Sequence, residues 1–98
     1  MCSCYYRFKD LKDLVLRFKI AQVLSVLGPQ YNIAPTDPAV VIPATGKDRI
    51  AKDLIFGIPN LLIKDKPSLL MNMHAESFGN KPHFRRYLLN QRCLVVAD

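Results

Sequence analysis

The residue with the most distinctive chemistry in this sequence is Cys2, which directly follows the initiator methionine. Removal of Met1 would leave Cys2 with a free α-amine and a thiol on adjacent carbon atoms. An α-amino group has a pKa of about 7.7–8.0, so a useful fraction of it is neutral and nucleophilic near neutral pH. Taken alone, Cys2 is better interpreted as an ordinary residue at the start of a strand. Whether it is a nucleophile must be judged from the rest of the sequence.

The N-terminal part of the chain predicts a strand followed by a helix. Residues 2–8 alternate loosely and include three aromatic side chains, which favours a short strand with Cys2 and Cys4 on one face. Residues 11–27 predict a helix, because apolar side chains recur at helical spacing near its start. Asp10 is the expected N-cap, and Gly28 is expected to end the helix together with the proline that follows it.

The middle of the chain is predicted to be extended. Prolines at positions 35 and 38 disfavour a helix within "YNIAPTDPAVVIPATG", and residues 39–42 predict a buried strand. Residues 49–58 favour a second strand, with a short helix as the alternative. The segment "SLLMNMHAESF" fits either type of element.

The C-terminal part predicts a helix and a final strand. "NKPHFRRYLLNQ" is typical of a helix, with Asn80 as N-cap and Pro82 in the first turn, where its missing N–H is not needed. "RCLVVAD" predicts a strand with no evident partner, which indicates a domain cut short. Unpaired strand edges invite pairing with another chain, so we expect self-association through such edges.

The composition is that of one small packed domain. The chain has 98 residues, half of them hydrophobic and 22% charged, and a formal net charge of +6. The excess of basic residues fits a polyanionic partner, and it fits a merely basic soluble protein equally well. No secretory signal is evident, and the longest apolar stretch, "LIFGIPNLLI", is too short to span a bilayer, so no membrane partner is expected.

Three cysteines are present, at positions 2, 4 and 93. Their odd number and the missing signal peptide indicate a reducing compartment, cytoplasmic or nuclear, without a disulfide framework. A metal site built from these cysteines with His74 or His83 is an alternative. It lacks both a Cys-x-x-Cys pair and a clean histidine spacing, so neither a metal nor another cofactor is predicted.

Three blocks of the sequence resemble the SOS response-associated peptidase (SRAP) family of abasic-site processing proteins. They are Met1-Cys2, "YNIAPT" at 31–36 and "NMHAESFGNKPHFRRYLLNQRCLVVAD" at 72–98. The family has Met-Cys-Gly-Arg, then Tyr-Asn-x-Ala-Pro-Thr, then Asn-Ala-Arg-Ala-Glu-Thr and Arg-Arg-Cys-Leu-x-Pro-Ala-Asp. The resemblance implies an α/β fold of the α+β type, with a mostly antiparallel, curved, barrel-like sheet and flanking helices. Residues 1–98 would form the N-terminal portion of one such domain.

The resemblance also implies a reaction at Cys2. Family members bind single-stranded DNA that contains an abasic site, remove their own Met1 and link covalently to the DNA through the N-terminal cysteine. The open form of an abasic deoxyribose is an aldehyde, so the α-amine would form an imine and the thiol would close a thiazolidine ring. Asn72 matches the family's active-site asparagine, whose amide could orient the amine or the sugar hydroxyl. Glu76, the only glutamate in the sequence, matches the motif glutamate and would act as a proton donor or a structural partner.

The resemblance also implies a set of DNA-binding residues, and two of them differ from the family pattern. It comprises Pro35 of the second block, Phe56 in place of a tryptophan-rich segment, His74 in place of an arginine, and Arg85. A largely neutral imidazole replaces a fixed bidentate guanidinium poorly, and fewer aromatic rings leave less stacking surface for bases. We therefore expect weak, salt-dependent DNA binding.

Two catalytic residues of the family follow the Ala-Asp motif, a glutamate and, further on, a histidine. This sequence ends at Asp98, so neither has a counterpart here. The main hypothesis is abasic-site processing with a covalent crosslink through Cys2, and the sequence does not decide whether the chain is an active peptidase or lyase. The alternative is a defective remnant or fragment that binds nucleic acid weakly at most.

Overall fold

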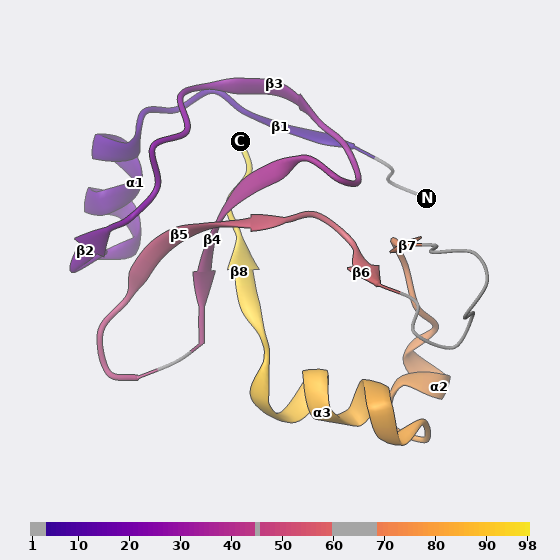
Figure 1. Cartoon of the computed structure of the whole chain (residues 1–98). Coiled ribbons are helices and arrows are strands. Elements are labelled where there is room, and N and C mark those ends of the chain that lie inside the picture. Colours follow the sequence, from indigo (N-terminus) through magenta and orange to yellow (C-terminus); the bar gives the residue numbers. More distant parts are fainter. Residues whose placement is uncertain (1–3, 45, 60–68) are drawn as a thin grey trace.

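A computed structural model describes residues 4–44, 46–59 and 69–98 (Figure 1). Its elements follow the order β1 (Tyr5–Arg7), α1 (Leu11–Phe18), β2 (Gln22–Val23), β3 (Gln30–Ile33), β4 (Pro38–Pro43), β5 (Ile50–Ile55), β6 (Ile58–Pro59), β7 (Leu69–Leu70), α2 (Ala75–Phe78), α3 (Pro82–Asn90) and β8 (Cys93–Val95). The expected mixed α+β fold with mostly antiparallel strands is confirmed. Within the described ranges the strands form three small sheets and no closed barrel.

A four-stranded sheet lies at the centre, in the order β2-β5-β4-β8. Strand β2 runs parallel to β5, and the other two pairings are antiparallel. The inner residues of β4, 39–42, are all buried, because β4 has a neighbour on each edge and both of its faces are covered. The predicted buried strand at 39–42 is therefore confirmed, and residues 50–55 form the expected second strand rather than a helix.

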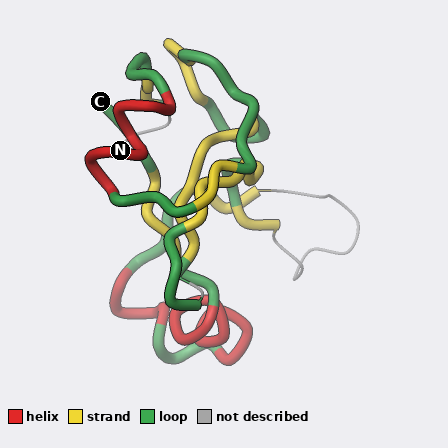
Figure 2. The backbone as a smooth tube through the Cα atoms, turned by 90° about the vertical axis from the view of Figure 1, so that its left-hand side faces the viewer, coloured by secondary structure: helices red, strands yellow, loops and turns green. Residues whose placement is uncertain are grey.

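Helix α1 covers one face of this sheet at one end of the molecule, and α2 and α3 lie at the other end (Figures 1 and 2). Alternate residues of β4 point toward α1, because strand side chains repeat every two residues. The buried core on this side consists of side chains from α1, the segment after it, β4, β5 and the residue after β8: Leu14, Ile20, Val40, Ile42, Ala51 and Val96.

The helix predicted for residues 11–27 is wrong beyond Phe18. Lys19 adopts a left-handed conformation with φ of 52°, and the N–H groups of Lys19 and Ile20 donate to the Val15 carbonyl. The chain then pairs with β5 as β2, and the N–H of Leu24 donates to the carbonyl of Ala51 at 2.8 Å. None of the helices in the described ranges is long and apolar enough to cross a membrane.

Helix α3 is confirmed, with Pro82 in its first turn, but its N-cap is Lys81 rather than Asn80. The Asn80 side chain instead donates to the carbonyl of Glu76 at 3.1 Å, at the end of α2. Asn80 therefore satisfies a carbonyl of the preceding helix and is not free to cap the next one.

The prediction that the final strand lacks a partner is wrong. Strand β8 pairs antiparallel with β4, in a register that places Val95 opposite Val41. Val96 follows the strand and is almost completely buried in the core against α1. The terminal segment is thus an integral part of the central sheet.

A two-stranded ribbon of β1 and β3 crosses over the central sheet and carries the buried side chain of Arg7 (Figure 1). The Arg7 guanidinium donates to the carbonyls of Lys9 at 2.8 Å, Gly28 at 2.6 Å and Leu27 at 3.2 Å. These bonds fix the end of β1 to the segment that leads into β3. A buried cation needs such acceptors, because it has lost its hydration shell.

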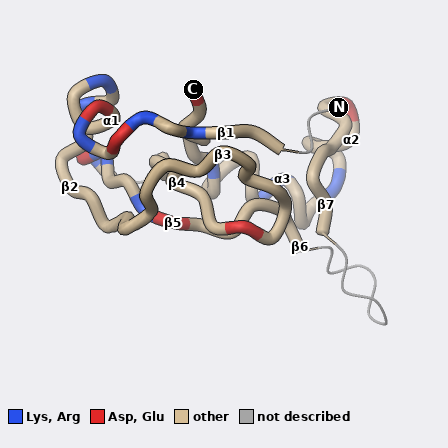
Figure 3. The backbone as a smooth tube through the Cα atoms, turned by 90° about the horizontal axis from the view of Figure 1, so that it is seen from above, with Lys and Arg blue, Asp and Glu red and all other residues tan. Residues whose placement is uncertain are grey.

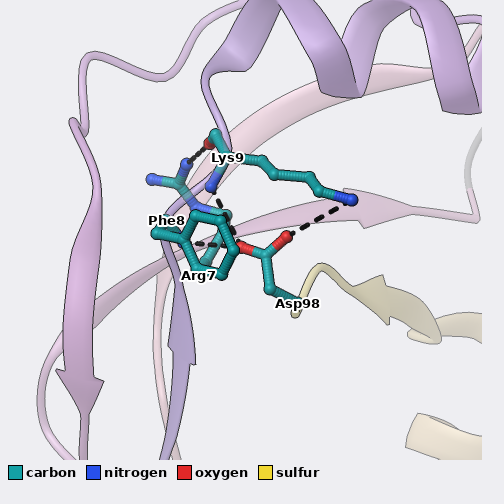
Figure 4. A network of polar contacts seen from close by, with 4 residues as sticks. All are labelled: Arg7, Phe8, Lys9 and Asp98. Carbon is teal, nitrogen blue, oxygen red and sulfur yellow. Dashed lines mark hydrogen bonds and ion pairs between the residues drawn. The ribbon is translucent and has the colours of Figure 1, made fainter.

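Asp98 connects the end of the described chain to the same ribbon (Figure 4). Its carboxylate accepts hydrogen bonds from the N–H groups of Phe8 and Lys9, and its own N–H donates to the Tyr6 carbonyl at 3.2 Å. Burial alone would raise the pKa of the Asp98 carboxyl. The hydrogen bonds and the charges of Lys9 and Arg7 outweigh that effect and lower the pKa below its usual range.

Asp98→Asn should therefore make the free energy of unfolding depend less on pH in the acidic range. Because folding lowers this pKa, the ionised carboxylate stabilises the folded state above about pH 3.9, and the contribution is lost as the pH falls through the lower folded value. Urea unfolding at several acidic pH values should show a steeper loss of stability on acidification in the unmodified protein than in Asp98→Asn. Asp48→Asn, an exposed carboxylate before β5, is the control. Equal pH dependence in both variants would contradict this role of Asp98.

Candidate functional site

The face of the central sheet opposite α1 borders a cavity of about 490 Å³. Its floor is made by side chains of β4, β5 and β8, and its walls come from β1, the segment around β6 and β7, α2 and the residue after α3. The floor consists of the side chains that alternate with the core residues: Ala39, Val41, Leu54 and Val95. A concave, mostly apolar site of this size is typical of a binding pocket for a small group.

A turn at Ala34–Asp37 holds one rim of this cavity. The Thr36 N–H donates to the Phe56 carbonyl, and the Phe56 N–H donates to the Asp37 carbonyl, both at 2.9 Å. The Asp37 carboxylate accepts the Ala34 N–H at 2.9 Å, which closes the turn on itself. The motif that contains Pro35 therefore acts as a rigid support for Phe56.

Phe56 packs edge-on against Tyr5 of β1, with ring centroids 5.9 Å apart. Both rings line the cavity, so the N-terminal strand and the segment after β5 meet at its rim. Thr36 in the supporting turn has φ of 81°, a left-handed conformation that costs a side-chain-bearing residue about 1–2 kcal/mol. Such strain is found where the surrounding contacts enforce a particular geometry.

The opposite wall depends on a close approach at Gly57. Strands β6 and β7 pair antiparallel here, with Ile58 opposite Leu70. Gly57 has φ of 116°, and a Cβ atom added to it would lie 3.3 Å from the side chain of Leu69. The backbone conformation therefore favours glycine here, and an added Cβ would also press against the Leu69 side chain.

Helices α2 and α3 close the far end of the cavity. Phe78 of α2 lines it and stacks against the buried ring of Phe84 in α3, with centroids 6.2 Å apart. Gln91, at the end of α3, and Cys93, at the start of β8, lie on the same wall. The last turn of α3 and the edge of the sheet therefore meet at this cavity.

The cavity lining contains no charged side chain among the described residues. Its polar groups are the phenol of Tyr5, the thiol of Cys93 and the amides of Asn72 and Gln91. Burial raises the pKa of the Cys93 thiol, and burial also raises the pKa of the Tyr5 phenol, against the effect of Arg7 and with a further increase from Cys93. Both groups are therefore neutral at physiological pH, and the cavity favours neutral over charged ligand groups.

Two of the residues predicted for the site meet in this cavity. Asn72 lines it from the segment between β7 and α2, and Phe56 lines it from the end of β5. Pro35 is not in the lining but belongs to the turn that holds Phe56. The structure therefore places Asn72 and Phe56 in the lining of one cavity.

Three other predicted residues lie on the surface and outside the cavity lining. His74 is the N-cap of α2, and its carbonyl accepts the N–H and the hydroxyl of Ser77. Glu76 is exposed in the first turn of the same helix, and Arg85 is exposed on α3. Cys2, the predicted nucleophile, lies outside the described residues.

Three cavity residues were missed as site candidates: Tyr5, Gln91 and Cys93. From the sequence, Cys93 belongs to the third family block and is a candidate metal ligand, and the apolar residues that follow it are typical of a strand. The described residues contain no cluster of three histidine, cysteine or acidic side chains suited to a metal ion. Within these ranges, Cys93 is thus a cavity residue rather than part of a ligand set.

The chain matches one known protein family over its full extent. The family is described as SOS response associated peptidase (SRAP), and the match spans residues 1–98. Similar curated proteins of Bacillus subtilis (strain 168) are "Abasic site processing protein YoqW" and "Abasic site processing protein YobE", each 30% identical over 102 residues. All of this chain is covered, but only 46% and 47% of these relatives, so it spans about half their length. No solved structure matches the chain.

Gly57→Ala should destabilise the protein and distort the cavity wall. A Cβ atom at φ of 116° is strained and crowds Leu69, which costs about 1–3 kcal/mol. Gly79→Ala is the matched control, because Gly79 has φ of −77° and no heavy atom within 4 Å of an added Cβ. Thermal unfolding should show a lower Tm for Gly57→Ala only. An unchanged Tm would mean that the β6–β7 pairing does not constrain this position.

Proposed function

The chain belongs to the SOS response associated peptidase (SRAP) family, and we propose on this basis that it processes abasic sites in single-stranded DNA. In this proposal Met1 is removed and Cys2 forms a covalent thiazolidine with the sugar aldehyde. The single observation that carries the proposal is the uncharged cavity that brings together Tyr5, Phe56 and Asn72. The printed names of the Bacillus relatives, which are abasic site processing proteins, agree with it.

The reaction proceeds in two balanced steps. The neutral α-amine of Cys2 adds to the aldehyde carbon of the open deoxyribose, and loss of one water molecule gives an imine. The Cys2 thiol then adds across the C=N bond, so that a carbon–sulfur bond forms and the thiol proton passes to the nitrogen. The product is a five-membered ring that contains both nucleophilic atoms of one residue, and no oxidant or cofactor is consumed.

Chain length keeps Cys2 close to the cavity. Cys2 precedes Tyr5 by three residues, and three residues span at most about 10 Å. Tyr5 itself belongs to the cavity lining and is fixed by its contact with Phe56. This short tether agrees with the proposal that the α-amine of Cys2 acts at the cavity rim.

The uncharged lining supports the chemistry of the amine. An apolar environment disfavours the charged ammonium form and lowers the pKa of an amine, which increases the neutral nucleophilic fraction at physiological pH. The described lining offers no carboxylate that would stabilise the ammonium instead. The amides of Asn72 and Gln91 can each donate and accept hydrogen bonds, which suits a sugar hydroxyl.

The geometry also suits a nucleotide that lacks its base. Phe56 at the rim offers an aromatic face to a neighbouring base, and stacking of this kind contributes about 1–3 kcal/mol. Helix α3, whose last residue is followed by the cavity residue Gln91, carries exposed cations that include Arg85, and arginine side chains commonly contact phosphates. His74 and Glu76 keep roles outside the cavity in this proposal, as surface contacts rather than as its lining.

The test is adduct formation with a single-stranded oligonucleotide that contains one abasic site. Protein whose Met1 is shown to be absent by intact mass should give an adduct that survives heating on a denaturing gel. Cys2→Ala should abolish it, and Cys2→Ser should give an adduct only after reduction, because a thiazolidine needs the thiol. A stable adduct with Cys2→Ala would contradict the mechanism.

Asn72→Ala should slow adduct formation roughly tenfold without changing the product, as expected for the loss of one hydrogen bond worth about 1–1.5 kcal/mol. Asn90→Ala, an exposed amide at the end of α3 and outside the lining, is the matched control. Equal rates of adduct formation for the two variants would show that Asn72 does not contribute to the reaction. If folded protein with a free Cys2 gives no adduct at all, the alternative of a weak nucleic-acid-binding remnant replaces the proposal.

A further inference from the structure

The uncharged cavity holds few groups that can give up a proton. Among the described residues its lining has no carboxylic acid and no imidazole, and strands β6 and β7, which form one wall, carry no charged residue (Figure 3). The amides of Asn72 and Gln91 donate hydrogen bonds but are not acids. The groups that remain in the described lining are the phenol of Tyr5 and the thiol of Cys93.

Three carboxylates belong to segments that border the cavity, but none of them lines it. The Asp37 carboxylate accepts a backbone N–H within its own turn. Asp53 of β5 lies opposite Val40, a core residue on the α1 face, and side chains of paired strand residues share a face of the sheet. Glu76 is exposed in the first turn of α2. None of these carboxylates is therefore placed to act inside the cavity.

The ring of Tyr5 is held in place, whereas its hydroxyl is free to act. The ring packs edge-on against Phe56 with centroids 5.9 Å apart, and Tyr5 pairs with Ile33 in the β1–β3 ribbon. No hydrogen bond joins the hydroxyl to another residue in the described ranges. Burial raises the pKa of the Tyr5 phenol most, and an ionised Cys93 would raise it further, so the phenol and the thiol lie within electrostatic range of each other. At physiological pH the Tyr5 phenol therefore carries its proton.

The buried cation Arg7 follows Tyr5 by two residues in the same strand. Its charge acts against burial and lowers the pKa of the Tyr5 phenol. A cation that lowers this pKa stabilises the phenolate relative to the phenol. A phenolate formed for a moment during a reaction is thus stabilised by a charge that the fold already holds in place.

We propose that Tyr5 is the proton donor that releases water from the addition product of Cys2 and the abasic sugar. This inference rests on the proposed function and assigns a catalytic group to it. Neither a carboxylic acid nor an imidazole in the described lining competes for this role, and a thiol is a weaker hydrogen-bond donor than a phenol. A phenol is also a far stronger acid than water, whose pKa is about 15.7.

The step is balanced in atoms and charge. The nitrogen lone pair forms the C=N bond while the C–O bond breaks, and the phenol proton passes to the departing hydroxyl to give water. A protonated imine and a phenolate remain. The Cys2 thiol then gives its proton to the phenolate as its sulfur bonds to the imine carbon. The products are the thiazolidine and one water molecule, and Tyr5 is regenerated.

Tyr5→Phe tests this role, because it removes the hydroxyl and keeps the ring that packs against Phe56. The matched control is Tyr6→Phe, the same change at the next residue, whose exposed ring stacks on Phe8 outside the lining. Single-turnover rates of adduct formation are measured with a single-stranded abasic oligonucleotide at saturating protein. Affinity is measured separately with a strand that carries a tetrahydrofuran abasic analogue, which cannot form an imine.

Tyr5→Phe should slow adduct formation roughly hundredfold at pH 7 and leave the affinity for the analogue strand within about twofold, because general acid catalysis acts on the rate and not on binding. Tyr6→Phe should change neither quantity by more than about twofold. Imidazole buffer added at constant pH and ionic strength should speed the reaction of Tyr5→Phe, since imidazolium replaces the missing acid, and should leave the rate of the unmodified protein unchanged.

Equal rates for Tyr5→Phe and the unmodified protein would overturn this inference alone, provided that the adduct still requires Cys2. A slow Tyr5→Phe variant that does not respond to imidazole, or an equal loss of rate in Tyr6→Phe, would reveal a structural effect and also overturn it. The absence of any adduct from the unmodified protein would overturn the proposed function and this inference with it.

Discussion

The position of the N-terminal strand β1 depends on two charged side chains that lie beside each other (Figure 4). They are the buried guanidinium of Arg7 in β1 and the carboxylate of Asp98, which follows β8. Arg7 is only 1% exposed, and both of its Nη atoms donate to backbone carbonyls. Asp98 binds the backbone of the same ribbon and lies close enough for the Arg7 charge to lower its pKa. These bonds hold β1 against the end of the chain and leave Tyr5 at the cavity rim. The position of Tyr5 at the rim therefore depends on contacts at the other end of β1.

The two faces of the central sheet have different surroundings. Alternate residues of β4 pack against α1 on one face, where the core is continuous, and border the cavity on the other. Short elements border the cavity, and each is held by few contacts. Two such contacts are the hydrogen bonds of the turn that holds Phe56 and the close approach of Leu69 to Gly57. The face of the sheet opposite α1 therefore borders a space without charged side chains among the described residues, which suits a neutral sugar.

Local sequence patterns predicted an element correctly where the packing of the fold matches the local pattern, as in the buried strand at residues 39–42. They failed at Lys19, where the chain leaves α1, because pairing of the following residues with β5 outweighs their helical pattern. They also missed Tyr5 and Cys93 in the cavity, since these residues meet only through pairings between distant strands. Asn72, which a family motif singled out and local periodicity did not, lines the same cavity.

The central claim is that the uncharged cavity receives the abasic nucleotide. Amide chemical shifts measured during titration with single-stranded DNA that carries a tetrahydrofuran abasic analogue test it directly, because the analogue has no aldehyde and cannot react. The account predicts that the shifts specific to the analogue, relative to undamaged strand, are largest at Tyr5, Phe56, Asn72 and Cys93. Analogue-specific shifts confined to α1 and the opposite face of the sheet, or identical shifts for both strands, would contradict it.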